Sequence, residues 1–114
     1  MTSAHETMQD LREPARQLRQ GIPEVIDGYA TMQRAVMTDG ALPAKVKELI
    51  ALAISATRQC DGCIAAHARG AAREQASDAE VAEAMGVVVL MNGGPGTVWG
   101  ARALAAYQEF SPDD

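Results

Sequence analysis

The sequence predicts one all-α domain of 114 residues, a compact bundle of five or six helices that assembles into a homo-oligomer. Alanine is the most frequent residue, with 22 copies, and it favours helix and lets helices pack closely. The apolar residues recur at helical spacing, without the alternation typical of strands. A chain this short fits a single domain and buries only a limited core alone, so its spare apolar surface indicates subunit contacts.

The first 40 residues predict two helices. Residues 1–20 are polar and charged, which is typical of an exposed peripheral helix that is partly frayed and broken near Pro14. Gly21 ends this helix, and Pro23 suits the first position of the next one, which runs to about Met37. The apolar residues of the second helix keep a helical spacing: Val25, Ile26, Tyr29, Met32, Val36 and Met37.

Two further helices follow in the middle of the chain. Pro43 opens the third helix, which extends to Thr57. Its apolar residues surround most of its circumference, so we expect this helix to be buried. After a tight turn at residues 58–59, a fourth helix begins at Cys60 and ends near Gln75.

The last third of the chain predicts a fifth and a sixth helix. Ser77 and Glu80 have the spacing of a capping box, which starts the fifth helix. The residues expected to point inward from this helix are Val81, Met85, Val88 and Val89. The glycine-rich run 93–96 breaks the chain before a final helix over 97–110 and allows close backbone packing. We expect the tail 111–114 to be disordered.

Composition excludes several classes of function. The formal net charge is −5 with a pI near 4.9, whereas nucleic-acid binding normally needs a basic patch. The longest strongly apolar stretch, residues 49–56, has eight residues, whereas a membrane span takes about 20. Residues 1–10 lack the apolar core of a signal peptide. We therefore expect a cytoplasmic protein, in which two cysteines three positions apart indicate metal or redox chemistry.

The chemistry-bearing motif is Cys60-Asp61-Gly62-Cys63, followed by His67. Positions three and four apart share one helix face, so both cysteines and the histidine should line up. The backbone N–H groups and partial positive charge of a helix start stabilise a thiolate. Cys63 lies next to His67, which can accept or return its proton.

Glu48 joins this group on geometric grounds. It lies in the third helix, beside the apolar stretch 49–56, where a carboxylate is not expected to be free in water. An antiparallel hairpin turning near residue 58 places Glu48 close to the level of His67. A carboxylate beside an imidazole fixes its tautomer and raises its basicity. We therefore predict a proton relay from Glu48 through His67 to Cys63, with a water bridging any gap.

Two other interpretations of the cysteines remain open. Cys60 and Cys63 are alternatively buried thiols that pack as small hydrophobes. With His67 and Glu48 they are alternatively zinc ligands, although structural zinc usually takes four Cys or His ligands. We expect neither a metal nor a cofactor. Haem attachment is excluded, because Ile64 stands where that motif needs a histidine. A thioredoxin-type domain is excluded as well, because it needs strands and the sequence predicts none.

Residues 48–110 resemble the carboxymuconolactone decarboxylase superfamily, in its alkyl hydroperoxidase D-like (AhpD-like) branch. The matching pieces are residues 48–55 (ELIALAIS), Cys60-x-x-Cys63-x-x-x-His67, residues 91–96 (MNGGPG) and a helix ending Glu109-Phe110. The resemblance implies an all-α fold that forms homotrimers or homohexamers. Between the cysteines, members often carry a His, Tyr or Glu, whereas this chain has Asp61 and Gly62.

In redox-active members, the cysteine matching Cys63 attacks the peroxide and the one matching Cys60 resolves it as a disulfide. The residues matching Glu48 and His67 form the proton relay. The resemblance thus implies a thiol-dependent peroxidase or disulfide oxidoreductase that takes a peroxide and an external dithiol reductant, either a thioredoxin-like or a lipoyl protein. The alternatives are a cofactor-independent decarboxylase of a lactone and a non-catalytic, redox-sensing oligomeric module.

Overall fold

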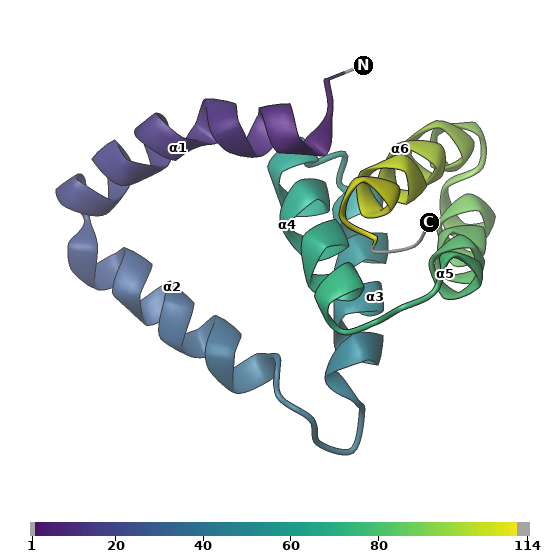
Figure 1. Cartoon of the computed structure of the whole chain (residues 1–114), viewed down its shortest axis with the longest axis horizontal. Coiled ribbons are helices and arrows are strands. Elements are labelled where there is room, and N and C mark those ends of the chain that lie inside the picture. The colour runs from purple at the N-terminus through teal and green to yellow at the C-terminus, as the bar shows by residue number, and fades with distance from the viewer. Residues whose placement is uncertain (1, 112–114) are drawn as a thin grey trace.

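The computed structural model describes residues 2–111. These residues form six helices and no strand, which confirms the all-α prediction (Figure 1). The helices are α1 (Ala4–Gly21), α2 (Pro23–Val36), α3 (Ala44–Thr57), α4 (Asp61–Arg73), α5 (Asp78–Asn92) and α6 (Gly94–Phe110). Residues 112–114 of the predicted tail lie outside the described part, whereas the N–H of Ser111 donates to the carbonyl of Tyr107.

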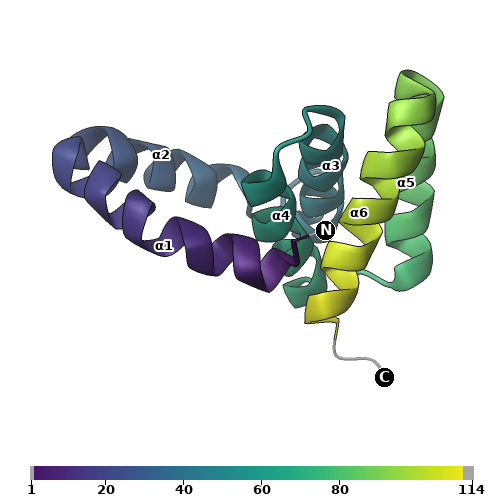
Figure 2. The ribbon, with the colours of Figure 1, turned by 90° about the horizontal axis from the view of Figure 1, so that it is seen from above.

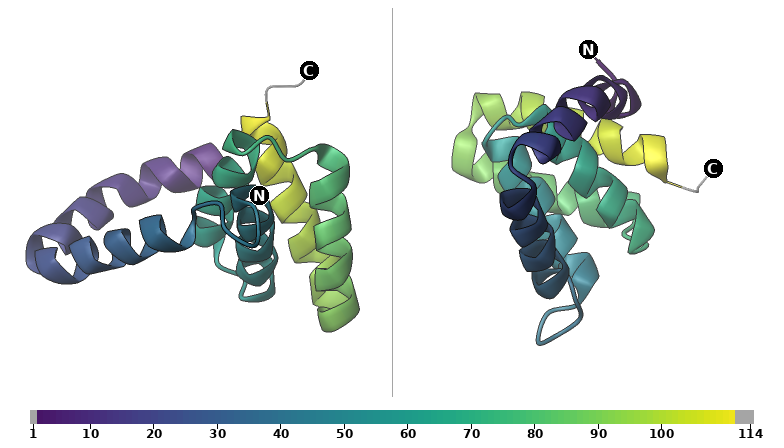
Figure 3. Two further views of the ribbon diagram at one scale, coloured as in Figure 1. Left: turned by 90° about the horizontal axis from the view of Figure 1, so that it is seen from below. Right: turned by 90° about the vertical axis from the view of Figure 1, so that its left-hand side faces the viewer.

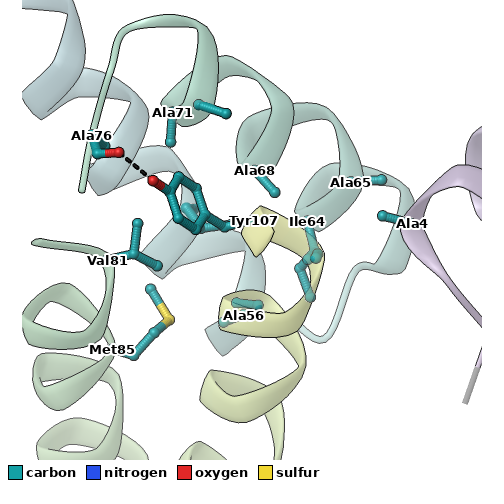
Figure 4. Packing of buried hydrophobic residues seen from close by; sticks show 14 of the residues in the cluster. Ala4, Ala56, Ile64, Ala65, Ala68, Ala71, Ala76, Val81, Met85 and Tyr107 are labelled. Carbon is teal, nitrogen blue, oxygen red and sulfur yellow. Dashed lines mark hydrogen bonds between the residues drawn. The ribbon is translucent and has the colours of Figure 1, made fainter. Parts of the chain in front are cut away.

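Helices α3 to α6 pack around one core, and we call them the body (Figures 1 and 2). The core is built on alanines of α4, among them Ala65, Ala68 and Ala71, which have no exposed surface. Their small side chains admit the ring of Tyr107 from α6, which packs near Val81 of α5 (Figure 4). The buried Tyr107 hydroxyl donates a hydrogen bond to the carbonyl of Ala76, so this polar group has a partner inside the core.

Helices α1 and α2 form an arm that projects from the body (Figure 3). Among the described helices α2 packs only against α1, and none of its residues is buried. Only the first two turns of α1 supply buried residues, Ala4 and Thr7. The Glu109 carboxylate of α6 accepts the backbone N–H groups of Ala4 and His5 at 2.8 and 3.0 Å, which fixes the start of the arm on the body.

Two predicted boundaries are wrong. Helix α1 runs unbroken through Pro14 to Gly21. Proline removes one backbone donor, but α1 is exposed from residue 9 onward, so water can satisfy the carbonyl left without a partner. Helix α6 begins at Gly94, because Gly93 alone, with φ +68°, breaks the chain. The predicted close packing is real at Gly96, where a Cβ would lie 2.7 Å from the carbonyl oxygen of Val88.

Burial also departs from expectation on two helices of the body. Val89 was expected to point inward but is 38% exposed. Ile50 and Ile54 of α3 are exposed as well, while Leu52 between them is fully buried. One side of α3 therefore faces the core, and the other presents apolar residues to the surroundings. No helix within residues 2–111 combines the length and apolar character needed to cross a bilayer.

Candidate active site

The α3–α4 turn presents the cysteine motif. Helix α3 ends through Gln59, whose φ of +55° places it in the left-handed region. The N–H of Gln59 donates to Ala56 and the N–H of Cys60 donates to Ser55, so the last carbonyls of α3 are satisfied. This closed turn delivers Cys60 to the N-cap of α4, as the sequence predicts to within one residue.

Cys60 and Cys63 form a disulfide, with their Cα atoms 5.2 Å apart. The Cys60 sulfur also accepts the backbone N–H of Cys63 at 3.2 Å and so acts as the side-chain cap of α4. Cys63 is exposed and Cys60 is half-buried. These positions do not fit the interpretation of two buried thiols that merely pack, and Cys63 is the more exposed residue of the pair.

Glu48 and His67 meet directly, without the intervening water that the sequence left open. The Nδ1 atom of His67 lies 2.8 Å from Oε1 of Glu48, and the two side chains are 18% and 7% exposed. This contact engages Nδ1 and leaves Nε2 available to a second partner. His67 follows Cys63 by one helical turn, so all four candidate residues belong to one hairpin.

The arm reaches this hairpin at Gly62, a contact that sequence reasoning missed. A Cβ on Gly62 would lie 2.9 Å from Cδ1 of Leu11 in α1. The space that a side chain between the cysteines would take is therefore occupied by Leu11. The glycine at position 62 was the available sign of a close contact there, but nothing in the sequence indicated which residue makes that contact.

A cavity of about 160 Å³ lies between α1, α4 and α6, on the side of Asp61 and Ile64. Trp99 lines it, and the Arg102 guanidinium sits 4.6 Å from the centre of the Trp99 ring, in a cation–π contact. Neither cysteine lines this cavity. Trp99 thus neighbours the motif without belonging to the group formed by the cysteines, His67 and Glu48.

No group of three or more His, Cys, Asp or Glu side chains within residues 2–111 is arranged to hold a metal ion. A zinc site made of the four candidate residues would need both sulfurs released from the disulfide. The arrangement as it stands offers dithiol and proton-transfer chemistry instead.

Comparison with known proteins gives four findings. Residues 23–106 match the carboxymuconolactone decarboxylase family. The fold is similar to the crystal structure of apo-lpg0406, a carboxymuconolactone decarboxylase family protein from Legionella pneumophila, with a TM-score of 0.85 and 39% identity, covering 90% of this chain and 92% of that one. An uncharacterized protein from Cupriavidus necator is 37% identical over 82% of this chain and 83% of its own length. Uncharacterized protein 4 in the cox locus of Paracoccus denitrificans is 36% identical over 74% of this chain and 76% of its own.

Proposed function

Since the chain belongs to the carboxymuconolactone decarboxylase family, we propose that it is an AhpD-like dithiol oxidoreductase that reduces peroxides or disulfides. One observation carries the proposal: the Cys60–Cys63 disulfide caps α4, one turn from a histidine whose Nδ1 meets the buried Glu48 carboxylate. A dithiol, a base and a group that orients the base are the parts that thiol catalysis needs.

In the oxidising half of the reaction, His67 takes the proton of the Cys63 thiol while Glu48 holds the imidazole. The Cys63 thiolate attacks one peroxide oxygen and the O–O bond breaks. The sulfur becomes a sulfenic acid, and the leaving oxygen takes the proton and departs as an alcohol. The Cys60 thiol then attacks the sulfenic sulfur, which forms the disulfide and releases water.

In the reducing half, an external dithiol, from a thioredoxin-like or lipoyl protein, attacks the sulfur of Cys63, the more exposed residue of the pair. Cys60 leaves as a thiolate, which keeps the hydrogen bond from the Cys63 N–H. The second thiol of the reductant then resolves the mixed disulfide, so both cysteines regain their thiols and the reductant takes up the disulfide. A cytoplasmic location belongs to this proposal, because such a reductant is maintained where thiols stay reduced.

The proposal includes assembly into a homotrimer or homohexamer. Support comes from α2, which carries a stripe of four apolar residues that are each more than half exposed: Val25, Tyr29, Met32 and Val36. A 14-residue helix without buried side chains is marginal in water, because most helical stability in proteins comes from packing. A second copy of the chain offers apolar surface of the same kind on α3 and α5.

Thiol titration before and after one equivalent of peroxide tests the function. The reduced protein should lose two thiols quickly and regain them with dithiothreitol or dihydrolipoamide. Cys63→Ser should abolish dimedone-trapped sulfenic acid, whereas Cys60→Ser should let it accumulate. Full turnover in both variants would contradict the assigned roles. A lactone decarboxylase would be indifferent to both substitutions, and a redox sensor would react slowly and without turnover.

A further inference from the structure

Gly70 is unusual in its place on α4. It lies inside the helix among alanines, where glycine costs about 1 kcal/mol relative to alanine. It is buried, so solvent exposure does not account for it. A Cβ built on Gly70 would lie 2.5 and 2.6 Å from the two carboxylate oxygens of Glu48, closer than real Cβ atoms approach other atoms.

The carboxylate therefore fills the space that a side chain at position 70 would take. Gly70 follows His67 by three positions, so both residues lie on the same face of α4. The Glu48 carboxylate crosses from α3 onto this face, over the bare backbone of Gly70, and there meets Nδ1 of His67. With the Glu48 side chain 7% exposed, a shift that clears a Cβ must also move the carboxylate from its partner.

We propose that Gly70 is a positioning residue that lets the Glu48 carboxylate reach His67. This inference deepens the proposed function and rests on it only for its kinetic consequences, because the placement of the carboxylate is measurable without any activity. The competing explanation is that Gly70 serves only the close packing of α3 on α4. The two explanations differ in one respect: a positioning effect disappears when Glu48 is absent.

The first test is nitrogen NMR of the His67 ring in a His5→Gln background, because Nδ1 of His5, the other histidine, also lies 2.8 Å from a carboxylate oxygen, that of Glu109. In the parent protein we expect the signature of an Nδ1–H group bonded to a carboxylate. Gly70→Ala should lose this signature, as Glu48→Ala does. The matched control is Gly86→Ala on α5, where nothing lies within 4 Å of the added Cβ. An unchanged His67 signature in Gly70→Ala would overturn the proposal.

The second test is the pH profile of peroxide-driven thiol loss. At neutral pH we expect Gly70→Ala to be slower by roughly 10- to 100-fold, less than the 10²- to 10⁴-fold that a general base contributes. The loss should shrink at high pH, where a thiol ionises without a base. The double variant Glu48→Ala/Gly70→Ala should be no slower than Glu48→Ala alone. A further slowing by the same factor would show that Gly70 acts independently of Glu48.

Gly70→Ala and the double variant also provide a control for a folding defect. Should Gly70→Ala unfold, the double variant with Glu48→Ala should fold, because removing the carboxylate makes room for the Cβ. A double variant that also fails to fold would overturn the proposal in favour of helix packing. Absence of both peroxide and disulfide reduction in the parent protein, with the NMR result as expected, would refute the proposed function and leave the role of Gly70 standing.

Discussion

The arm and the body carry apolar residues at the same helical spacing but bury them differently. In the body, Leu52, Val81 and Tyr107 are fully enclosed. In the arm, Tyr29 and Met32 belong to an equally regular stripe, yet they are 58% and 57% exposed. Helical spacing therefore identifies the apolar face of a helix, but it does not identify what buries that face.

The arm is joined to the body mainly at its ends. Glu109 holds the start of α1, and Lys47 of α3 donates to the carbonyls of Val36 and Thr38 at 2.8 and 2.7 Å. Between these anchors Leu11 touches the cysteine motif at Gly62. Polar contacts, together with the buried first turns of α1, therefore locate the arm, whereas apolar burial holds the body together.

The largest expected effect is loss of body stability in Leu52→Ala. Leu52 is 0% exposed, so its truncation should leave a cavity and lower the free energy of unfolding by about 2–5 kcal/mol. Leu18→Ala is the matched control in the arm, where Leu18 is 54% exposed. Urea denaturation at several protein concentrations measures both. The Leu52→Ala loss should be the same at every concentration, and a comparable, concentration-independent loss in Leu18→Ala would remove the distinction between arm and body.

The second effect concerns association. Tyr29→Asp places a charge in the middle of the α2 stripe and should weaken self-association by about 2 kcal/mol or more, roughly a 30-fold rise in the dissociation constant. Sedimentation velocity over a concentration series measures it. Thr31→Asp, which adds the same charge on the other side of α2, should associate as the parent does. Equal association of all three proteins would mean that the stripe is not an interface.

The third effect is acid sensitivity of the arm. Partial burial acts to raise the pKa of Glu109, but the N–H groups of Ala4 and His5 and the His5 ring outweigh it and hold the pKa below its ordinary value of 4.5. A lowered folded-state pKa stabilises the fold above pH 4.5, and this stabilisation is lost as the pH falls through the folded-state value. Glu109→Gln should therefore cost about 1 kcal/mol at pH 6 and less in acid.

Thermal unfolding of the parent and Glu109→Gln between pH 3 and 6 measures this difference, with hydrogen exchange to locate it in α1. Glu83→Gln removes a carboxylate from the exposed surface of α5 and serves as the control. A stability difference that stays constant down to pH 3 would contradict the ionic origin of the contact.

The smallest expected effect is a gain in the stability of α2. Gly28 lies inside α2 with nothing within 4 Å of a Cβ, so Gly28→Ala should stabilise this helix by about 0.5–1 kcal/mol. Circular dichroism of α2 as an isolated peptide, and of the whole protein during thermal unfolding, shows whether the substitution stabilises or destabilises the helix. A loss of helicity in the whole protein alone would indicate that another chain packs against Gly28.

Local signals made most helix boundaries predictable. Gly21 and Pro23 separate α1 from α2, and the Ser77–Glu80 capping box starts α5 as expected. The predicted break at Pro14 was wrong. The energetic cost of a proline inside a helix depends on whether the carbonyl left without a partner reaches water, and this depends on the tertiary structure. The placement of Glu48 near the level of His67 followed from counting residues back from the hairpin turn, since antiparallel helices have the same rise per residue. Their direct contact did not follow from this count, which left a bridging water open.

Contacts between distant segments were not predictable. Leu11 over Gly62 and Glu109 at the start of α1 each join residues 51 or more positions apart. No periodic pattern encodes such pairs. The sequence did hold a usable sign of the Gly70 contact, a glycine inside an alanine-rich helix, but the carboxylate that explains it comes from another helix.

The Glu109 contact brings the first turn of α1 against the last turn of α6, which makes the path of the chain nearly circular. A circular permutant that links these turns and opens the chain at residues 38–42 should therefore keep the fold. In the natural order, trimming from the first residue removes α1, which packs on the body, before α2, which meets the body through the Lys47 hydrogen bond to Val36. The permuted order reverses this, so that the arm becomes a terminal extension that can be shortened turn by turn, from its free end toward the body.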